Sequence, residues 1–170
     1  MKTSDAIFAI LAKYVDTVFF VPGGGAMHLV DSLGRSGLKH ISMLHEQGVA
    51  FAAVGYAQYR KSLGVCLVTS GPGATNAITG CAAAWMDSAP VLFISGQANS
   101  KTLISDTGLR VRGVQEVDII PIVKPITKWA VRPLAGQTVP LLKRMIEICL
   151  DGRRGPTWID LCLDIQAEEI

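Results

Sequence analysis

Four loops rich in glycine or polar residues follow predicted strands and could bring backbone N–H groups close to a ligand. They read VPGGGA at residues 21–26, LHEQG at 44–48, SGPGATN at 70–76 and SGQAN at 95–99. Glycine has no Cβ, so its backbone can approach a ligand closely. In open parallel sheets, ligands bind at the carboxyl ends of the strands, where loops lead into helices. The sequence therefore predicts a ligand site built from these loops.

Neither of the two common phosphate-binding motifs is present in these loops. The dinucleotide motif GxGxxG requires a third glycine. That position holds His28 when the motif is started at Gly23, and Asn76 when it is started at Gly71. The sequence also lacks GxxxxGK followed by Ser or Thr, which is the P-loop motif. Binding of NAD or ATP is therefore disfavoured.

Glu46 is the most suggestive carboxyl group, because it directly follows a predicted strand and opens a predicted helix. One interpretation is a first-turn acid that complements the helix dipole. The other is a carboxyl group at a ligand-binding edge in apolar surroundings. Burial would raise its pKa and the helix N-terminus would lower it, and the sequence leaves both interpretations open.

Other reactive side chains show no catalytic or metal-binding pattern. The three histidines have no metal-ligand spacing, Ser70 is not part of a GxSxG motif, and the four cysteines lie in apolar runs without CxxC spacing. We expect ordinary structural roles for this set, which comprises His28, His40, His45, Ser70, Cys66, Cys81, Cys149 and Cys162.

Composition excludes several classes of protein. The chain has 170 residues, of which 49% are hydrophobic, so disorder is excluded. Its 16 basic residues nearly balance 14 acidic ones, which argues against a nucleic-acid partner. Residues 62–86 carry no charge, but the Gly-Pro-Gly at 71–73 breaks any helix there, so we expect no membrane span. Residues 1–16 do not resemble a secretory signal, and we predict a soluble, cytoplasmic protein.

Strands and helices alternate along the chain. Helices are predicted over 4–13 (capped by Thr3 or Ser4), 26–35, 46–61, 74–86, 116–123 and 139–150, and strands over 17–21, 40–43, 65–69, 91–95, 126–131 and 157–161. A loop is predicted over 96–113, and residues 165–170 are interpreted as a tail or as the start of a further segment. Short apolar strands separated by helices are typical of a parallel sheet covered on both faces. We predict a single α/β domain over residues 1–170, with three α/β/α layers and about six mostly parallel strands.

The predicted helix over 74–86 (ATNAITGCAAAWM) has no charged residue on any face. A surface helix normally shows an apolar stripe and a charged face. A sheet covers one side of this helix, so the other side needs a partner. Self-association through it is one hypothesis, and cover by neighbouring helices of the same chain is the other.

Taken in order, the loops resemble one family. VPGGGA, LHEQGVAFAAVGYAQ, VTSGPGATNAITGCAAAWMDSAPVLFISGQ and GVQEVDIIPIVKPITKWA together are similar to the N-terminal pyrimidine-binding domain of thiamine diphosphate enzymes, in the acetolactate synthase and pyruvate oxidase group. The resemblance covers roughly residues 1–165, and it implies the thiamine diphosphate-binding fold.

The resemblance implies a cofactor and a reaction class. The chain would be the pyrimidine-binding part of an enzyme that decarboxylates or joins small 2-keto acids with thiamine diphosphate. Glu46 would activate the cofactor through a hydrogen bond to N1′ of the aminopyrimidine, and Gln115 would lie on the substrate side. Further cofactor contacts are implied for Pro22, Gly23, Gly24, Thr69, Pro72 and Asn76.

The sequence departs from the family pattern in three ways. Val114 stands where acetolactate synthases have Phe in an FQE motif, and PGGGAMH replaces PGGAIMP, which puts acetolactate formation itself in question. The family's GDG…N motif, which holds Mg²⁺ and the diphosphate, is missing, so we expect no metal ligands here and a second domain elsewhere. FAD use stays open.

Three interpretations follow from the resemblance. The chain is the N-terminal part of a longer homodimeric or homotetrameric enzyme, or an alpha-type subunit of a split decarboxylase whose partner carries the GDG motif. The third interpretation is a non-catalytic scaffold that kept the fold. The presence of Glu46, Gln115 and SGPGATN together favours the two catalytic interpretations.

Overall fold

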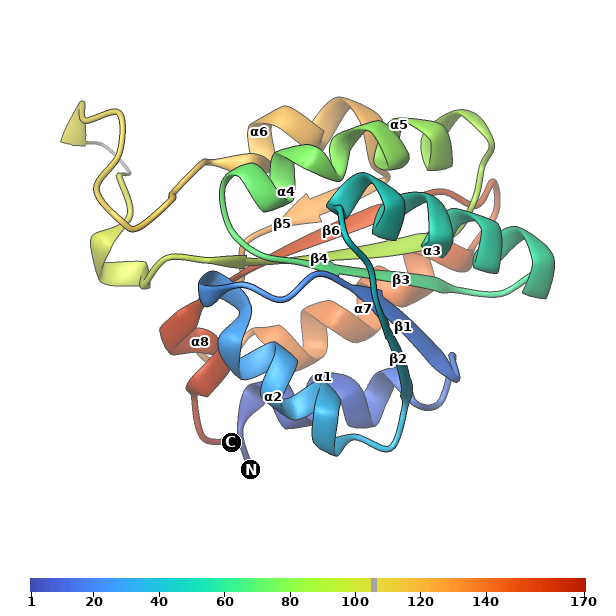
Figure 1. Cartoon of the computed structure of the whole chain (residues 1–170), viewed down its shortest axis with the longest axis horizontal. Coiled ribbons are helices and arrows are strands. Elements are labelled where there is room, and N and C mark those ends of the chain that lie inside the picture. The colour runs from blue at the N-terminus through green and yellow to red at the C-terminus, as the bar shows by residue number, and fades with distance from the viewer. Residues whose placement is uncertain (105–106) are drawn as a thin grey trace.

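A single six-stranded parallel sheet forms the centre of the computed structural model, which describes residues 1–104 and 107–170 (Figure 1). Its strand order is β2-β1-β3-β4-β6-β5. The strands are β1 (Thr17–Phe20), β2 (Lys39–Ser42), β3 (Gly64–Val68), β4 (Val91–Gln97), β5 (Trp129–Val131) and β6 (Thr157–Cys162). The predicted α/β class with about six parallel strands is confirmed.

Helices cover both faces of the sheet in two layers (Figure 1). One layer holds α1 (Thr3–Leu11), α2 (Met27–Arg35), α7 (Thr138–Leu150) and α8 (Leu163–Ala167); the other holds α3 (Glu46–Arg60), α4 (Pro72–Asn76), α5 (Ile78–Met86) and α6 (Ile119–Val123). Short 3-10 helices are η1 (Gly24–Ala26), η2 (Ser100–Thr102) and η4 (Lys124–Ile126).

The central strands supply both hydrophobic cores because successive side chains point to opposite faces. In β3, Val65 and Leu67 join the core under α1, α2 and α7, whereas Cys66 and Val68 join the core under α3 and α5. Every residue of β3, β4 and β6 is buried. This explains why β3 and the first half of β4 read as apolar runs rather than as an alternation.

The predicted helix over 74–86 is wrong in its start and in its continuity. The chain turns at Gly71, whose positive φ of 57° suits glycine, and α4 then begins at Pro72. Proline at the first helical position is favourable because its missing N–H would have no helical partner there. A second helix, α5, follows at Ile78, and Gly80 lies so close to Ala50 of α3 that a Cβ would clash.

The predicted tail over 165–170 is also wrong. Its first residues belong to α8, and the backbone beyond pairs with the start of the chain. Thr3 N–H donates to the carbonyl of Glu168 (2.7 Å), and Ile170 N–H donates to that of Met1 (3.0 Å). The N-cap of α1 is Lys2 rather than the expected Thr3 or Ser4, both of which are buried.

Several further boundaries differ from the predictions. The strand expected over 126–131 is shorter, because residues 124–126 form η4 and only 129–131 pair with β6. The helix expected over 116–123 begins at Ile119, because Glu116 is held by the N–H groups of Ile104 and Gly113, and residues 117–118 by Gln97 of β4 and by Arg132. Part of the expected loop over 96–113 is strand or 3-10 helix, and its residues 105–106 lie outside the described residues.

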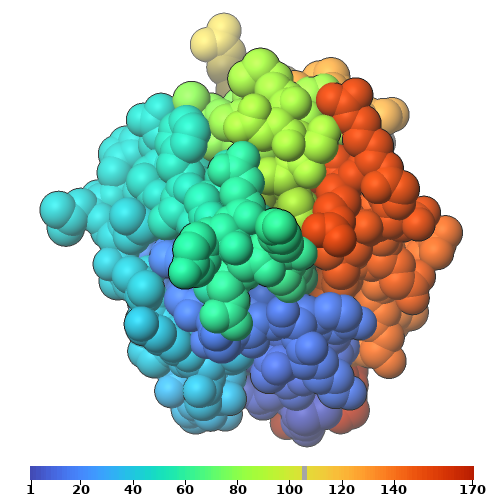
Figure 2. Space-filling view, turned by 90° about the vertical axis from the view of Figure 1, so that its right-hand side faces the viewer, coloured from blue at the N-terminus to red at the C-terminus, as the bar shows by residue number. Residues whose placement is uncertain are grey.

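The amino ends of the strands form the face shown in Figure 2. Side chains link neighbouring segments there: Arg154 donates to the carbonyl of Lys61 (3.0 Å), and Arg153 donates to the hydroxyl of Ser88 (2.8 Å). The glycine-rich loops lie at the opposite, carboxyl ends. In the two described ranges, no helix combines the length and the apolar character needed to cross a bilayer.

Candidate functional site

The loops after β1 and β3 meet at the carboxyl edge of the sheet because their strands are hydrogen-bonded neighbours. Gly25 N–H donates to Oγ1 of Thr69 (3.0 Å). A Cβ on Gly23 would lie 2.5 Å from Thr69, and one on Gly25 would lie 2.6 Å from Oγ of Ser70. The two glycines are therefore required by this close packing, and the contact fixes the position of the 21–26 loop.

Glu46 lies at the same carboxyl edge of the sheet, after β2, the strand beside β1. It opens α3 directly after β2, and its side chain is half-buried. Asn76, the last residue of α4, donates its amide to Oε2 of Glu46 (3.0 Å). A Cβ on Gly73 would lie 2.7 Å from Thr69 and 3.4 Å from Oε1 of Glu46, so Gly73 packs between these two side chains. Thr69, Glu46 and Asn76 thus lie close together at this edge.

His45 has a structural role beside Glu46. Its Nδ1 accepts a hydrogen bond from the N–H of Gln47 (3.1 Å), which makes His45 the N-cap of α3. Glu46 is consequently held in the first turn of a 15-residue helix, close to the positive end of the helix dipole.

Gln115 lies on the other side of the glycine loops. Its backbone carbonyl packs against Gly71, where a Cβ would clash, and its own φ is 52°. A pocket of about 320 Å³ opens beside it, lined by Gly24, Gly25, Met27, Ser70, Ala98, Asn99, Thr102, Val114, Gln115 and Leu163. Val114 is 84% exposed at this site, so the residue that departs from the FQE motif borders the pocket.

The remaining predicted contacts lie around the first loop. Pro22 does not line the Gln115 pocket; it borders a second, shallower pocket of about 480 Å³ together with Gly23, Gly24 and Met27. Pro72 is exposed at the start of α4. Sequence reasoning missed Gly25, Ser70 and Met27 as site residues, although their positions within PGGGAM and SGPG could have pointed to them.

The cysteines lie away from these pockets as buried free thiols. Burial raises the pKa of Cys149 and of Cys162 to about 12, so both thiols stay protonated and unreactive at neutral pH. This confirms their expected place in the core. Over residues 1–104 and 107–170, no group of three His, Cys, Asp or Glu side chains is arranged to hold a metal ion.

The site suits a flat, nitrogen-containing ring better than a phosphate group. Its central polar group is the Glu46 carboxylate, which can accept a hydrogen bond from a protonated ring nitrogen but would repel an anion. Glycine backbone on either side leaves room for a ring face to approach. The residues present therefore fit an aminopyrimidine, whereas the described residues offer no cluster for a diphosphate-bound metal.

Comparisons with known proteins agree with this geometry. Residues 1–121 match the family described as thiamine pyrophosphate enzyme, N-terminal TPP binding domain, where thiamine pyrophosphate (TPP) is another name for thiamine diphosphate. The acetolactate synthase isozyme 2 large subunit of Escherichia coli is 39% identical over 161 residues, covering 94% of this chain and 28% of that protein. A probable acetolactate synthase large subunit of Methanocaldococcus jannaschii is 40% identical over 172 residues. The match covers 100% of this chain and 28% of that protein.

The chain thus spans less than a third of the length of these relatives. The match to the family model nevertheless includes the loops after β1, β2, β3 and β4 and the segment with Gln115. On this evidence, the chain belongs to the thiamine pyrophosphate enzyme family and corresponds to its N-terminal TPP-binding domain.

Proposed function

We propose that this chain is the pyrimidine-binding half of a thiamine diphosphate-dependent enzyme that acts on 2-keto acids, in the manner of acetolactate synthases. One observation carries the proposal: the carboxylate of Glu46, oriented by Asn76, lies beside the glycine-rich loops that follow β1 and β3. The names of the relatives support the reaction class. The same site would serve a multidomain polypeptide or a split enzyme with a partner subunit.

Each residue of the site has a definite task in this proposal. Glu46 hydrogen-bonds the ring nitrogen N1′ and shares a proton with it, while Asn76 fixes the carboxylate through Oε2. Thr69 holds the 21–26 loop through Gly25 N–H, so that Pro22, Gly23 and Gly24 can approach the ring. Pro72 orients α4, and Gln115 faces the substrate side. Bound thiamine diphosphate supplies the electron sink for loss of CO₂ from the 2-keto acid.

The diphosphate end of the cofactor requires a second set of residues. The sequence contains no GDG motif, and a diphosphate is normally neutralised by Mg²⁺ held by oxygen ligands. We propose that this Mg²⁺ is held by another domain or subunit, so that one active site forms from two parts. The 170-residue chain alone should therefore bind thiamine diphosphate only weakly.

Titration of the 170-residue chain with thiamine diphosphate and Mg²⁺ tests the proposed function. We expect binding in the millimolar range, with amide shifts at Gly24, Glu46 and Gly73 followed by NMR spectroscopy. Binding at micromolar or lower concentration would contradict the half-site. The absence of any shift at these amides up to the highest soluble concentration would contradict pyrimidine binding itself.

Self-association is proposed through the layer formed by α3 and α5. Its large apolar side chains are exposed: Phe51 and Tyr59 on α3, and Trp85 and Met86 at the end of α5, with exposed fractions between 42% and 87%. Trp85 and Met86 also line one pocket with Lys128, Arg153 and Arg154, and exposed apolar surface rimmed by polar residues marks protein–protein contacts. We expect a homodimer in sedimentation at micromolar concentration, and dissociation in the variant Trp85→Glu. A monomer of 18.1 kDa at those concentrations would refute this interface.

A further inference from the structure

Gln115 is held in a backbone conformation that its own residue type does not favour. Its φ of 52° lies in the left-handed region, which non-glycine residues rarely adopt. Neither a helix nor a strand contains it, and its side chain is exposed. Contacts from its neighbours must therefore determine where Gln115 lies, since strained conformations persist only when the surroundings impose them.

The next residue, Glu116, is turned into the protein. Its side chain is only 5% exposed, in contrast to the exposed Val114 and Gln115 before it. Oε1 accepts a hydrogen bond from the N–H of Ile104 (2.6 Å), and Oε2 accepts one from the N–H of Gly113 (3.0 Å). A single carboxylate therefore ties together two points of the backbone that are nine residues apart in the sequence.

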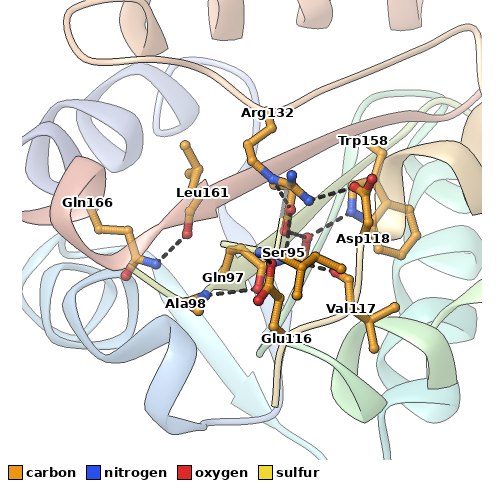
Figure 3. A network of polar contacts seen from close by, with 12 residues as sticks. Ser95, Gln97, Ala98, Glu116, Val117, Asp118, Arg132, Trp158, Leu161 and Gln166 are labelled. Atoms are coloured by element: carbon orange, nitrogen blue, oxygen red, sulfur yellow. Dashed lines mark hydrogen bonds and ion pairs between the residues drawn. The ribbon is translucent and has the colours of Figure 1, made fainter. Parts of the chain in front are cut away.

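The two residues after Glu116 are fixed from the sheet (Figure 3). Gln97, at the end of β4, donates its side-chain amide to the carbonyl of Val117 (2.9 Å) and to Oδ2 of Asp160 (3.1 Å). Arg132 donates to Oδ1 of Asp118 and to Oδ2 of Asp160, both at 2.8 Å. Residues 117 and 118 are thus anchored to β4 and β6, which leaves Glu116 to fix the side of the segment that carries Gln115.

Only a carboxylate can hold both backbone donors at this position. A buried charge is costly unless it is hydrogen-bonded, and no ion pair of Glu116 occurs among the described residues, so the two N–H groups are its compensation. Hydrogen bonds to an ionised acceptor are roughly twice as strong as neutral ones. Glutamine has the same shape, but its NH₂ group would face one of the two donors.

We propose that Glu116 is a positioning residue: its buried carboxylate ties Ile104 to Gly113 and thereby holds Gln115 at the rim of the pocket formed by Gly24, Gly25 and Ser70. The consequence for catalysis rests on the proposed function, in which Gln115 faces the substrate side of the cofactor. Because the carbonyl of Gln115 packs closely against Gly71, the position of Gln115 also determines where the SGPGATN loop lies.

Amide hydrogen exchange of the ¹⁵N-labelled chain tests the first part of this proposal. In Glu116→Gln, the amides of Ile104 and Gly113 should exchange about tenfold faster or more, because loss of a buried hydrogen bond favours local opening. The amide of Ile94 in β4 should keep its protection. Glu147→Gln is the matched control, since Glu147 is exposed and pairs only with Arg144; it should change neither loop amide.

Unchanged exchange at Ile104 and Gly113 in Glu116→Gln would overturn the proposal. An equal loss of protection at Ile94 would overturn it too, because Glu116 would then act on global stability alone. If Glu116→Gln does not fold, hydrogen exchange of the unmodified chain tests the proposal instead. Its Ile104 and Gly113 amides should exchange about tenfold or more slower than that of exposed Arg112, and equal rates would refute the role of Glu116.

A second measurement separates this proposal from the proposed function. Thiamine diphosphate with Mg²⁺ should shift the amides of Gln115 and Glu46 in the unmodified chain, whereas in Glu116→Gln the shift at Gln115 should be lost and that at Glu46 kept. A full response of Gln115 in the variant would overturn the positioning role. If the unmodified chain shows no response anywhere, the proposed function fails, while the exchange data still decide whether Glu116 holds the loop.

Discussion

Replacement of Glu46 by Gln is expected to lower the rate of C2 proton exchange of bound thiamine diphosphate by about 100-fold or more, the usual contribution of a positioned acid or base. The measurement requires an assembly that includes the diphosphate-binding part, in the same polypeptide or in a partner. An amide cannot exchange a proton with N1′, yet its oxygen can still accept the hydrogen bond from Asn76. The fold and the orientation of the side chain should therefore be preserved.

The competing explanation for Glu46 is that it only complements the dipole of α3. That role is worth about 0.3–1 kcal/mol, so Glu46→Gln would lower the unfolding temperature slightly and leave C2 exchange unchanged. Such a result would contradict the catalytic role. Glu147→Gln on α7 provides the control, because it makes the same chemical change at an exposed side chain and should affect neither exchange nor cofactor binding.

The second large effect is expected from Asp160→Ala, which should lower the free energy of unfolding by about 3–5 kcal/mol, as for other broken buried pairs. Asp160 is 1% exposed. Its carboxylate accepts hydrogen bonds from Ser95 Oγ (2.6 Å), Gln97 Nε2 (3.1 Å) and Arg132 Nε (2.8 Å). Burial raises the pKa of Asp160, although Arg132 opposes this. Removal of the carboxylate would leave three donors without their acceptor.

Urea unfolding followed by circular dichroism measures this change, and Asp118→Ala is the matched control. Asp118 pairs with the same guanidinium (2.8 Å), but its side chain is 47% exposed. Exposed pairs contribute about 0–1 kcal/mol. Equal losses in the two variants would show that burial of the Asp160 network has no special importance for stability.

Local sequence patterns predicted the elements of the sheet well. The largely apolar runs around Val65, Val91 and Thr157 each became a parallel strand, because strands buried on both faces are mostly apolar. Helices α3 and α7 were also placed correctly, to within a residue or two at their ends. In these segments the local propensity and the tertiary environment favour the same structure.

Predictions failed where distant contacts decide the structure. The helix predicted over 74–86 is divided at Ala77, and on either side of the break Asn76 reaches Glu46 and Gly80 packs on Ala50 of α3. Residues 165–170 were interpreted as a tail, although Glu168 and Ile170 pair with Thr3 and Met1 across the whole length of the chain. No local pattern encodes these contacts, because their partners are far apart in the sequence; those between the chain ends also use backbone groups that any residue type could supply.

The sequence by itself determined the family, the fold class and the identity of the glycine loops, because glycine, proline and Glu46 at these spacings suit few other structures. Tertiary structure alone decided how they meet: Thr69 fixes the first loop, and Asn76 orients Glu46. It also turned Glu116 inward while its neighbour Gln115 faces the pocket. The physical reason is that a buried carboxylate must find hydrogen-bond donors, and the fold, rather than the order of residues, brings those donors to it.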